Sequence, residues 1–187
     1  MLKLLIQSEV IYVSNQDIKI QVKKLQDGDM SVFDDIYYQT KDLVFYSILG
    51  ILKDYSLSED IMQDTYLKAL SKVHSYKPTH SFKSWVVTIA KNLAINEYNR
   101  RKKETSVDIQ TDEMFLGQTE SRSENQILIE QIFKVLNDTE REIVLLHVIG
   151  DLKHREIAKL LNKPIGTITW SYKNSLEKLK KELNESR

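Results

Sequence analysis

The chain has 187 residues, 41% of them hydrophobic, with 27 Lys or Arg against 27 Asp or Glu, which suits one large or two small globular domains. It has no cysteine, which excludes disulfides, thiolate metal ligands and a cysteine nucleophile, and we expect a reducing compartment, the cytoplasm. Because only five glycines and two prolines interrupt the chain, the predicted fold class is all-α.

Residues 1–14 are predicted to form a short N-terminal extension. Their apolar run is interrupted by Lys3 and Glu9, and no small-residue cleavage site follows it. The run is also too short to cross a bilayer. We therefore expect neither a signal peptide nor direct insertion into a membrane.

A first helical domain is predicted over residues 15–103. Apolar residues recur there every three or four positions, which indicates helices over 15–26, 29–52, 56–73 and 82–103. Gly28 is placed to end the first helix, and Gly50 to end the second one early. Ser56 and Glu59 have capping-box spacing and predict the start of the third helix.

The third helix presents Asp60, Gln63, Asp64 and Lys68 on one side, because residues three or four apart share a helix face. Two carboxylates one turn apart, without a third ligand, are more typical of a solvated face than of a metal site. We expect no metal and no cofactor.

The loop 74–80 and the helix after it have the composition of a nucleic-acid surface. The loop contains two histidines, too few ligands for zinc. The helix carries aromatic residues and ends in four consecutive cations, residues 100–103, and cations with aromatic rings are typical of single-strand binding. Phe82 and Trp85 are also well explained as core residues.

Residues 104–122 are predicted to be an acidic flexible linker. From residue 104 to 130 there are seven acidic residues and one arginine, a net charge of minus six. A second helical domain follows over 123–187. Capping-box spacing recurs at Ser123 with Gln126 and at Asn137 with Glu140.

Residues 152–181 predict a helix-turn-helix. Asn162 tolerates the left-handed conformation that ends a helix, and Pro164 is well shaped to open the next one. Residues 151–187 contain nine Lys or Arg against five Asp or Glu, a net of plus four, which suits phosphates. An ordinary helical hairpin is the alternative interpretation.

Residues 60–66 (DIMQDTY) and 81–103 (SFKSWVVTIAKNLAINEYNRRKK) resemble the second conserved region of bacterial RNA polymerase sigma factors of the extracytoplasmic-function (ECF) group. The helix-turn-helix resembles their fourth region. The resemblance implies a non-enzymatic protein that binds core RNA polymerase and directs promoter recognition and melting. Promoter DNA and an anti-sigma factor are the other implied partners, with no small-molecule substrate. The alternative is a self-sufficient helix-turn-helix regulator that binds duplex operators.

The resemblance also assigns residues to three surfaces. Those implied to bind core polymerase are Asp60, Gln63, Asp64 and Leu67. Those implied to bind the minus-ten element are Lys77, His80, Phe82, Lys83, Trp85, Lys91, Asn92, Asn96, Arg100 and Arg101. Those implied to bind the upstream element are Arg155, Lys163, Thr167, Thr169, Trp170, Ser171, Lys173 and Asn174.

The chain departs from the family where basic residues usually follow the glycine of the second helix. Thr169, Trp170 and Ser171 stand there instead. Recognition of the upstream element is therefore expected to use hydroxyl hydrogen bonds, contact with a thymine methyl group and indirect readout, rather than pairing of arginine with guanine.

Overall fold

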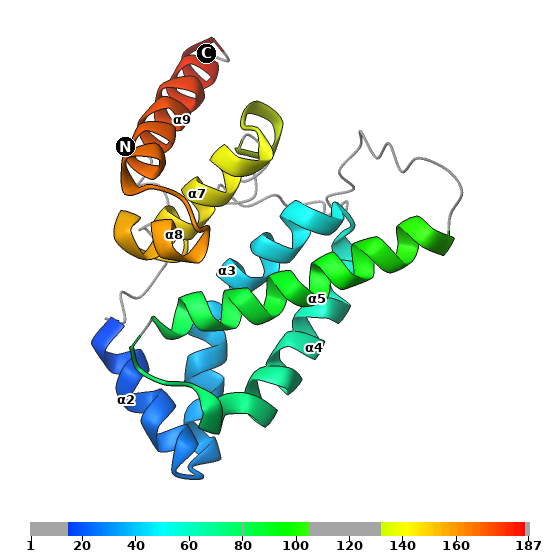
Figure 1. The fold of residues 1–187 in the computed structure, drawn as a ribbon, viewed down its shortest axis with the longest axis vertical. Helices are drawn as coiled ribbons and strands as arrows, with labels where there is room; N and C mark the ends of the chain where they lie inside the picture. Colours follow the sequence, from blue (N-terminus) through cyan, green and yellow to red (C-terminus); the bar gives the residue numbers. More distant parts are fainter. Residues whose placement is uncertain (1–14, 80, 105–131, 186–187) are drawn as a thin grey trace. The chain divides into compact units, whose positions relative to one another are not determined.

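The computed structural model describes residues 15–79, 81–104 and 132–185, and every long element in these ranges is helical (Figure 1). This confirms the all-α prediction. The described residues fall into two compact units, 15–104 and 132–185. The predicted extension, and the predicted linker after Glu104, lie outside the described residues. Among the described helices, none combines the length and apolar character that crossing a membrane requires.

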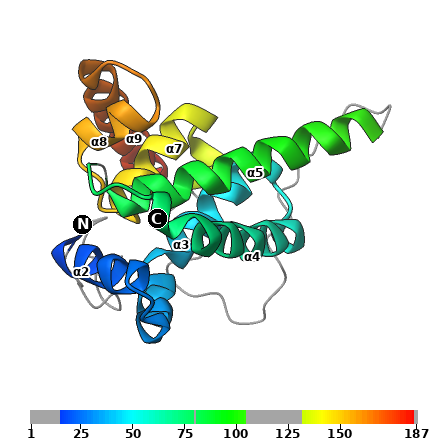
Figure 2. The same ribbon diagram turned by 60° about the horizontal axis from the view of Figure 1, so that its bottom comes forward.

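The first unit is built on three long helices, α3 (Phe33–Leu52), α4 (Tyr55–Lys72) and α5 (Phe82–Glu104). Each packs against the other two, and α2 (Asn15–Gln26) packs against α3 (Figures 1 and 2). Ala90 and Ala94 of α5 are fully buried, so two small side chains let this helix approach its neighbours closely. Short 3-10 turns precede α3 (Met30–Val32) and follow α4 (Val73–Ser75).

Two predicted helix boundaries in this unit are wrong. Gly50 lies inside α3, because the buried Ile48, Leu49 and Leu52 outweigh the cost of about 1 kcal/mol for a helical glycine. Ser56 does not cap α4. Asp54, with an extended backbone, precedes it and accepts the Leu57 amide at 3.1 Å.

The second unit contains α7 (Asp138–Val148), α8 (His154–Leu160) and α9 (Ile165–Glu185), which pack pairwise after a helical segment at 132–135 (Figure 1). The capping box of Asn137 and Glu140 is confirmed at the start of α7. After α7 ends at Val148, the residue in the left-handed conformation is Asp151, with φ of 52°.

The turn between α8 and α9 has the predicted form. Asn162 adopts a φ of 51°, and the Lys163 amide donates to the Ala158 carbonyl at 3.0 Å, which closes the end of α8. The Pro164 carbonyl accepts the Ile168 amide at 3.2 Å and starts the hydrogen bonding of α9. The helix-turn-helix prediction is therefore confirmed.

Candidate nucleic-acid and partner surfaces

The solvent side of α4 carries an acidic stripe, formed by Asp60, Gln63, Asp64 and Leu67. All four side chains are exposed, and Leu67 retains 66% of its exposure. The opposite side of the helix is buried, where the Tyr66 hydroxyl lies 2.8 Å from the Thr40 hydroxyl. The exposed leucine beside two carboxylates leaves an apolar group and negative charge available to a partner that is complementary to both.

The loop after α4 is fixed at its root by a side chain that the sequence did not indicate. The Gln26 amide of α2 donates to the carbonyls of Val73 at 2.8 Å and Tyr76 at 2.9 Å. These partners lie 47 and 50 residues away, so no local pattern could identify them. Lys77 stays exposed beyond this root, and His80 lies outside the described residues.

The start of α5 faces the core. Part of the DNA surface that the sequence predicted there is therefore buried. Phe82 is 3% exposed, and its ring centroid lies 5.4 Å from those of Tyr76 and Trp85. Lys83 is 8% exposed, and Trp85 is half-buried. Because the first turn of α5 covers the root of the loop, Phe82 and Lys83 are not available to DNA on this surface.

Further along α5, Asn92, Asn96 and Asn99 form an exposed amide ridge. They are spaced by four and three residues and lie opposite the buried Ala90 and Ala94. Lys91 beside them is half-buried. Asparagine amides both donate and accept hydrogen bonds, so this ridge suits the edges of unpaired bases.

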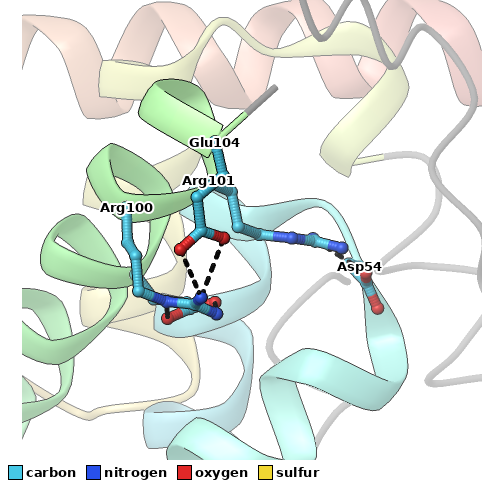
Figure 3. Close-up of polar contacts among 5 residues, drawn as sticks. Asp54, Arg100, Arg101 and Glu104 are labelled. Atoms are coloured by element: carbon cyan, nitrogen blue, oxygen red, sulfur yellow. Dashed lines mark hydrogen bonds and ion pairs between the residues drawn. The ribbon is translucent and has the colours of Figure 1, made fainter. Parts of the chain in front are cut away.

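The basic end of α5 is partly engaged within the chain (Figure 3). Arg100 donates to Glu97 at 2.6 Å and to both carboxylate oxygens of Glu104 at 2.9 Å, and these bonds, to Glu97 first, raise its pKa further. Arg101 donates to Asp54 at 3.1 Å and ties α5 to the cap of α4. Exposed ion pairs contribute little, so Arg100 can exchange its carboxylates for phosphates.

In the second unit, α9 turns one face to solvent and one to the core. Thr167, Trp170 and Lys173 are exposed, and Trp170 retains 68% of its exposure. Lys163 in the turn and Arg155 on α8 are exposed as well. Together with Thr169, which is also exposed, these five residues are the exposed part of the predicted upstream-element surface.

Three residues predicted for that surface make contacts within the unit. Ser171 is 6% exposed, because the 3.6-residue period of the helix places it near Ile168 and Ser175 on the buried side. The Asn174 amide donates to Glu140 at 3.0 Å. The Thr169 hydroxyl donates to the Ile165 carbonyl at 3.0 Å.

Glu140 fastens α9 to the start of α7, in an arrangement that we call the Glu140 clamp. Its side chain is buried and accepts from Asn174 and, at 2.7 and 2.9 Å, from Lys178. Burial raises the pKa of Glu140, but the hydrogen bond from Lys178 and those from Asn137 and Asn174 outweigh it, so this pKa lies below its ordinary value. The clamp sets where the exposed face of α9 points.

A histidine pair lies beside α9. The rings of His147 and His154 are 4.9 Å apart, and both pack against Tyr172. Because the Thr169 hydroxyl donates elsewhere, it accepts the proton of His154 Nδ1 at 3.2 Å. His154 Nε2 is buried without a partner among the described residues. Burial, and the charge of His147, lower the pKa of His154.

Comparison with known families matches both units. The family Sigma-70 region 2 matches residues 36–104, and the family Sigma-70, region 4 matches residues 126–179. The chain is 26% identical to the ECF RNA polymerase sigma factor SigW of Bacillus subtilis, over 90% of this chain and 97% of SigW. It is 29% identical to SigM of the same organism, over 69% of this chain and 81% of SigM.

The chain belongs to the ECF group of sigma factors. As a sigma factor it directs transcription initiation, and the operator-binding alternative is not favoured, because it leaves the first unit without a role. Two solved structures share the fold. One is the sigma factor RpoE in complex with the anti-sigma factor NepR from Bartonella quintana, with a TM-score of 0.62, 20% identity and coverage of 84% of this chain and 99% of RpoE. The other is CnrH with the cytosolic domain of CnrY, with a TM-score of 0.59, 15% identity and coverage of 90% and 97%.

The two matched regions contain the surfaces described above. The acidic stripe, the root of the loop and the amide ridge of this sigma factor all lie within the region 2 match, which ends at Glu104, the last residue of α5. The Glu140 clamp and the exposed face of α9 lie within the region 4 match. No group of three potential metal-ligating side chains occurs in the described parts of the two units.

Proposed function

We propose that this sigma factor divides its work among three surfaces. The acidic stripe of α4 binds core RNA polymerase, the loop 74–80 with the amide ridge of α5 holds the opened minus-ten element, and the exposed face of α9 binds the upstream element as duplex. The protein is non-enzymatic, uses no cofactor and acts in the cytoplasm. The exposed Leu67 within the acidic stripe is the observation that carries the core-binding assignment.

Docking on the acidic stripe combines two contributions. Burying the exposed Leu67 side chain contributes about 1.5 to 3 kcal/mol when the partner offers an apolar pocket. Asp60 and Asp64 precede it by seven and three positions on the same side of the helix and select a basic partner surface, because like charges on the wrong partner would repel. This surface suits a partner that offers an apolar pocket next to a basic patch.

Promoter opening needs a surface that prefers unpaired DNA. Unstacking costs a few kcal/mol per step, and capture of the released bases offsets that cost. The amide ridge supplies neutral donors and acceptors for base edges, while Lys102 and Lys103 lie exposed at the end of α5 for the backbone. Gln26 holds the root of the loop in place, so the exposed Lys77 starts from a fixed position.

An anti-sigma factor completes the proposed partners. RpoE and CnrH, which share this fold, were each solved in a complex, RpoE with an anti-sigma factor and CnrH with the cytosolic domain of CnrY. Both the acidic stripe and the exposed face of α9 are surfaces that such a partner would have to cover or distort to prevent initiation.

A titration against core polymerase tests the docking surface. We expect Asp60→Lys, Asp64→Lys and Leu67→Ser each to weaken the complex at least tenfold, with unchanged helical content because all three residues are exposed. Asp34→Lys, an equal charge change at an exposed site on α3, is the matched control and should bind normally. Equal affinity for the stripe variants and the control would remove the stripe from the proposal.

Permanganate reactivity of unpaired thymines, measured with core polymerase present, tests the opening surface. A variant with Asn92→Ala and Asn96→Ala should open few duplex promoters but act almost normally on a template with a preformed mismatch bubble. Lys103→Gln should stay weak on both templates and weaken further with salt. Equal defects of the amide variant on duplex and bubble would contradict its role in opening.

A further inference from the structure

The exposed face of α9 presents an apolar aromatic ring where sigma-factor relatives are expected to present basic side chains. Because each residue advances about 100° around a helix, Trp170 lies about 160° from the buried Ile168. Its side chain keeps 68% of its exposure, the largest value among the exposed large hydrophobic residues of the described ranges. This ring therefore lies on the side of α9 that faces away from the core.

Most polar side chains near Trp170 already have hydrogen-bond partners within the protein or are buried. The Thr169 hydroxyl donates to the Ile165 carbonyl and accepts from His154, and the Asn174 amide donates to the buried Glu140. Ser171 is buried. Arginine and lysine are the usual readers of guanine, and asparagine and glutamine those of adenine. The helix contains no arginine and no glutamine, and its Asn174 is bonded to Glu140.

Two exposed polar residues remain beside the ring. Lys173 carries a flexible point charge and suits a phosphate, which fixes position without reading sequence. Thr167 offers one hydroxyl, which bonds to any base and discriminates weakly. The strongest remaining source of discrimination is the Trp170 ring, and an apolar ring gains most where a base edge is also apolar.

The thymine methyl group is the apolar feature of base edges in the major groove. We infer that Trp170 is a specificity-determining residue of this sigma factor, and that it reads a thymine methyl group in the upstream element. The inference rests on the proposed role of α9. The Glu140 clamp and the bond between His154 and Thr169 support it, because they fix the rotation of α9 from both sides of the helix.

The first step of the test identifies the element. Full-length protein with core RNA polymerase is used to select initiating promoters from a fragment pool, and the upstream positions that matter are mapped. A pool that yields no transcript overturns the proposed function and this inference together. An upstream element without thymine on either strand overturns this inference alone.

The second step removes only the methyl groups. Thymines of the upstream element are replaced by deoxyuridine, one at a time, and holoenzyme affinity is compared on the two DNAs. We expect a loss of about fourfold for each methyl group that Trp170 contacts. Trp170→Ala should bind both DNAs equally, and Trp170→Phe should keep part of the difference.

Matched variants separate readout from general weakening. Lys173→Gln should weaken binding to both DNAs alike, so its ratio of affinities for thymine and deoxyuridine DNA should equal that of the parent. Thr167→Val should also keep this ratio. The inference is overturned if the parent binds thymine and deoxyuridine DNA equally at every position. It is also overturned if Trp170→Ala keeps the parent's ratio of the two affinities. Because Trp170 is exposed, its substitution should leave the fold intact.

Photocrosslinking gives an independent position. In 5-bromodeoxyuridine a bromine atom takes the place of the thymine methyl group. Irradiation links the ring carbon that carried the bromine to an adjacent aromatic side chain. The cross-linked peptide should contain Trp170 when the bromine stands at the position that deoxyuridine identified. A cross-link at that position to a peptide outside α9 overturns the inference.

Discussion

The Glu140 clamp supports a quantitative prediction about the stability of the second unit. Glu140→Ala removes the cap contact to the Asn137 amide at 3.3 Å, the bond from Asn174 at 3.0 Å and the ion pair with Lys178 at 2.7 Å. The long cap contact contributes about 0.5 kcal/mol, and the other two about 1 kcal/mol each, because Asn174 and Lys178 keep access to water. We expect a loss of about 2 to 3 kcal/mol.

Two further variants test whether burial of the carboxylate explains this value. In Lys178→Met the buried carboxylate of Glu140 loses its partner, whereas in Glu140→Gln the half-exposed Lys178 is simply released to water. Gln also preserves the capping box. We therefore expect a cost of about 2 kcal/mol for Lys178→Met and about 1 kcal/mol for Glu140→Gln.

Urea unfolding of the full chain, followed by circular dichroism, measures these differences. The Glu140→Ala variant should also melt on the order of 10 °C earlier in its second unit. Glu177→Gln, an equal charge change at an exposed site on α9, is the control and should stay within about 0.5 kcal/mol of the parent. If Glu140→Gln lowers the free energy of unfolding more than Lys178→Met does, burial of the carboxylate does not explain the contribution of the clamp to stability.

Two other predictions concern contacts between distant residues. Gln26→Leu leaves the loop after α4 without its two anchoring bonds, so we expect fewer permanganate-reactive thymines on duplex promoters at unchanged affinity for core polymerase; normal opening would contradict this. His154 has a lowered pKa when folded, so the unfolded chain binds its proton more readily, and the second unit should lose stability as pH falls below about 6.5. His154→Asn keeps an amide donor for Thr169 and should flatten this dependence between pH 5 and 7.

The sequence by itself determined the local features of this sigma factor. Composition predicted the all-α class. The spacing of residues along a helix, a property of near neighbours in sequence, predicted the helix-turn-helix and the acidic face of α4. Asn162 and the capping box of Glu140 were predictable for the same reason, since backbone conformation and caps depend on residues one to four positions apart. The pairing of the two motifs in one chain predicted the family.

Only the tertiary structure decided which of the predicted site residues face a ligand. Phe82 and Ser171 fit the family pattern by position, but packing between helices buries both. Gln26 carried no sequence signal, because its partners follow it by about 50 residues. The bonds of Asn174 to Glu140 and of Thr169 to Ile165 are seen only in the structure, although Thr169 stays exposed. A helix pattern predicts a face, whereas contacts from distant parts of the chain determine which polar groups on it remain available.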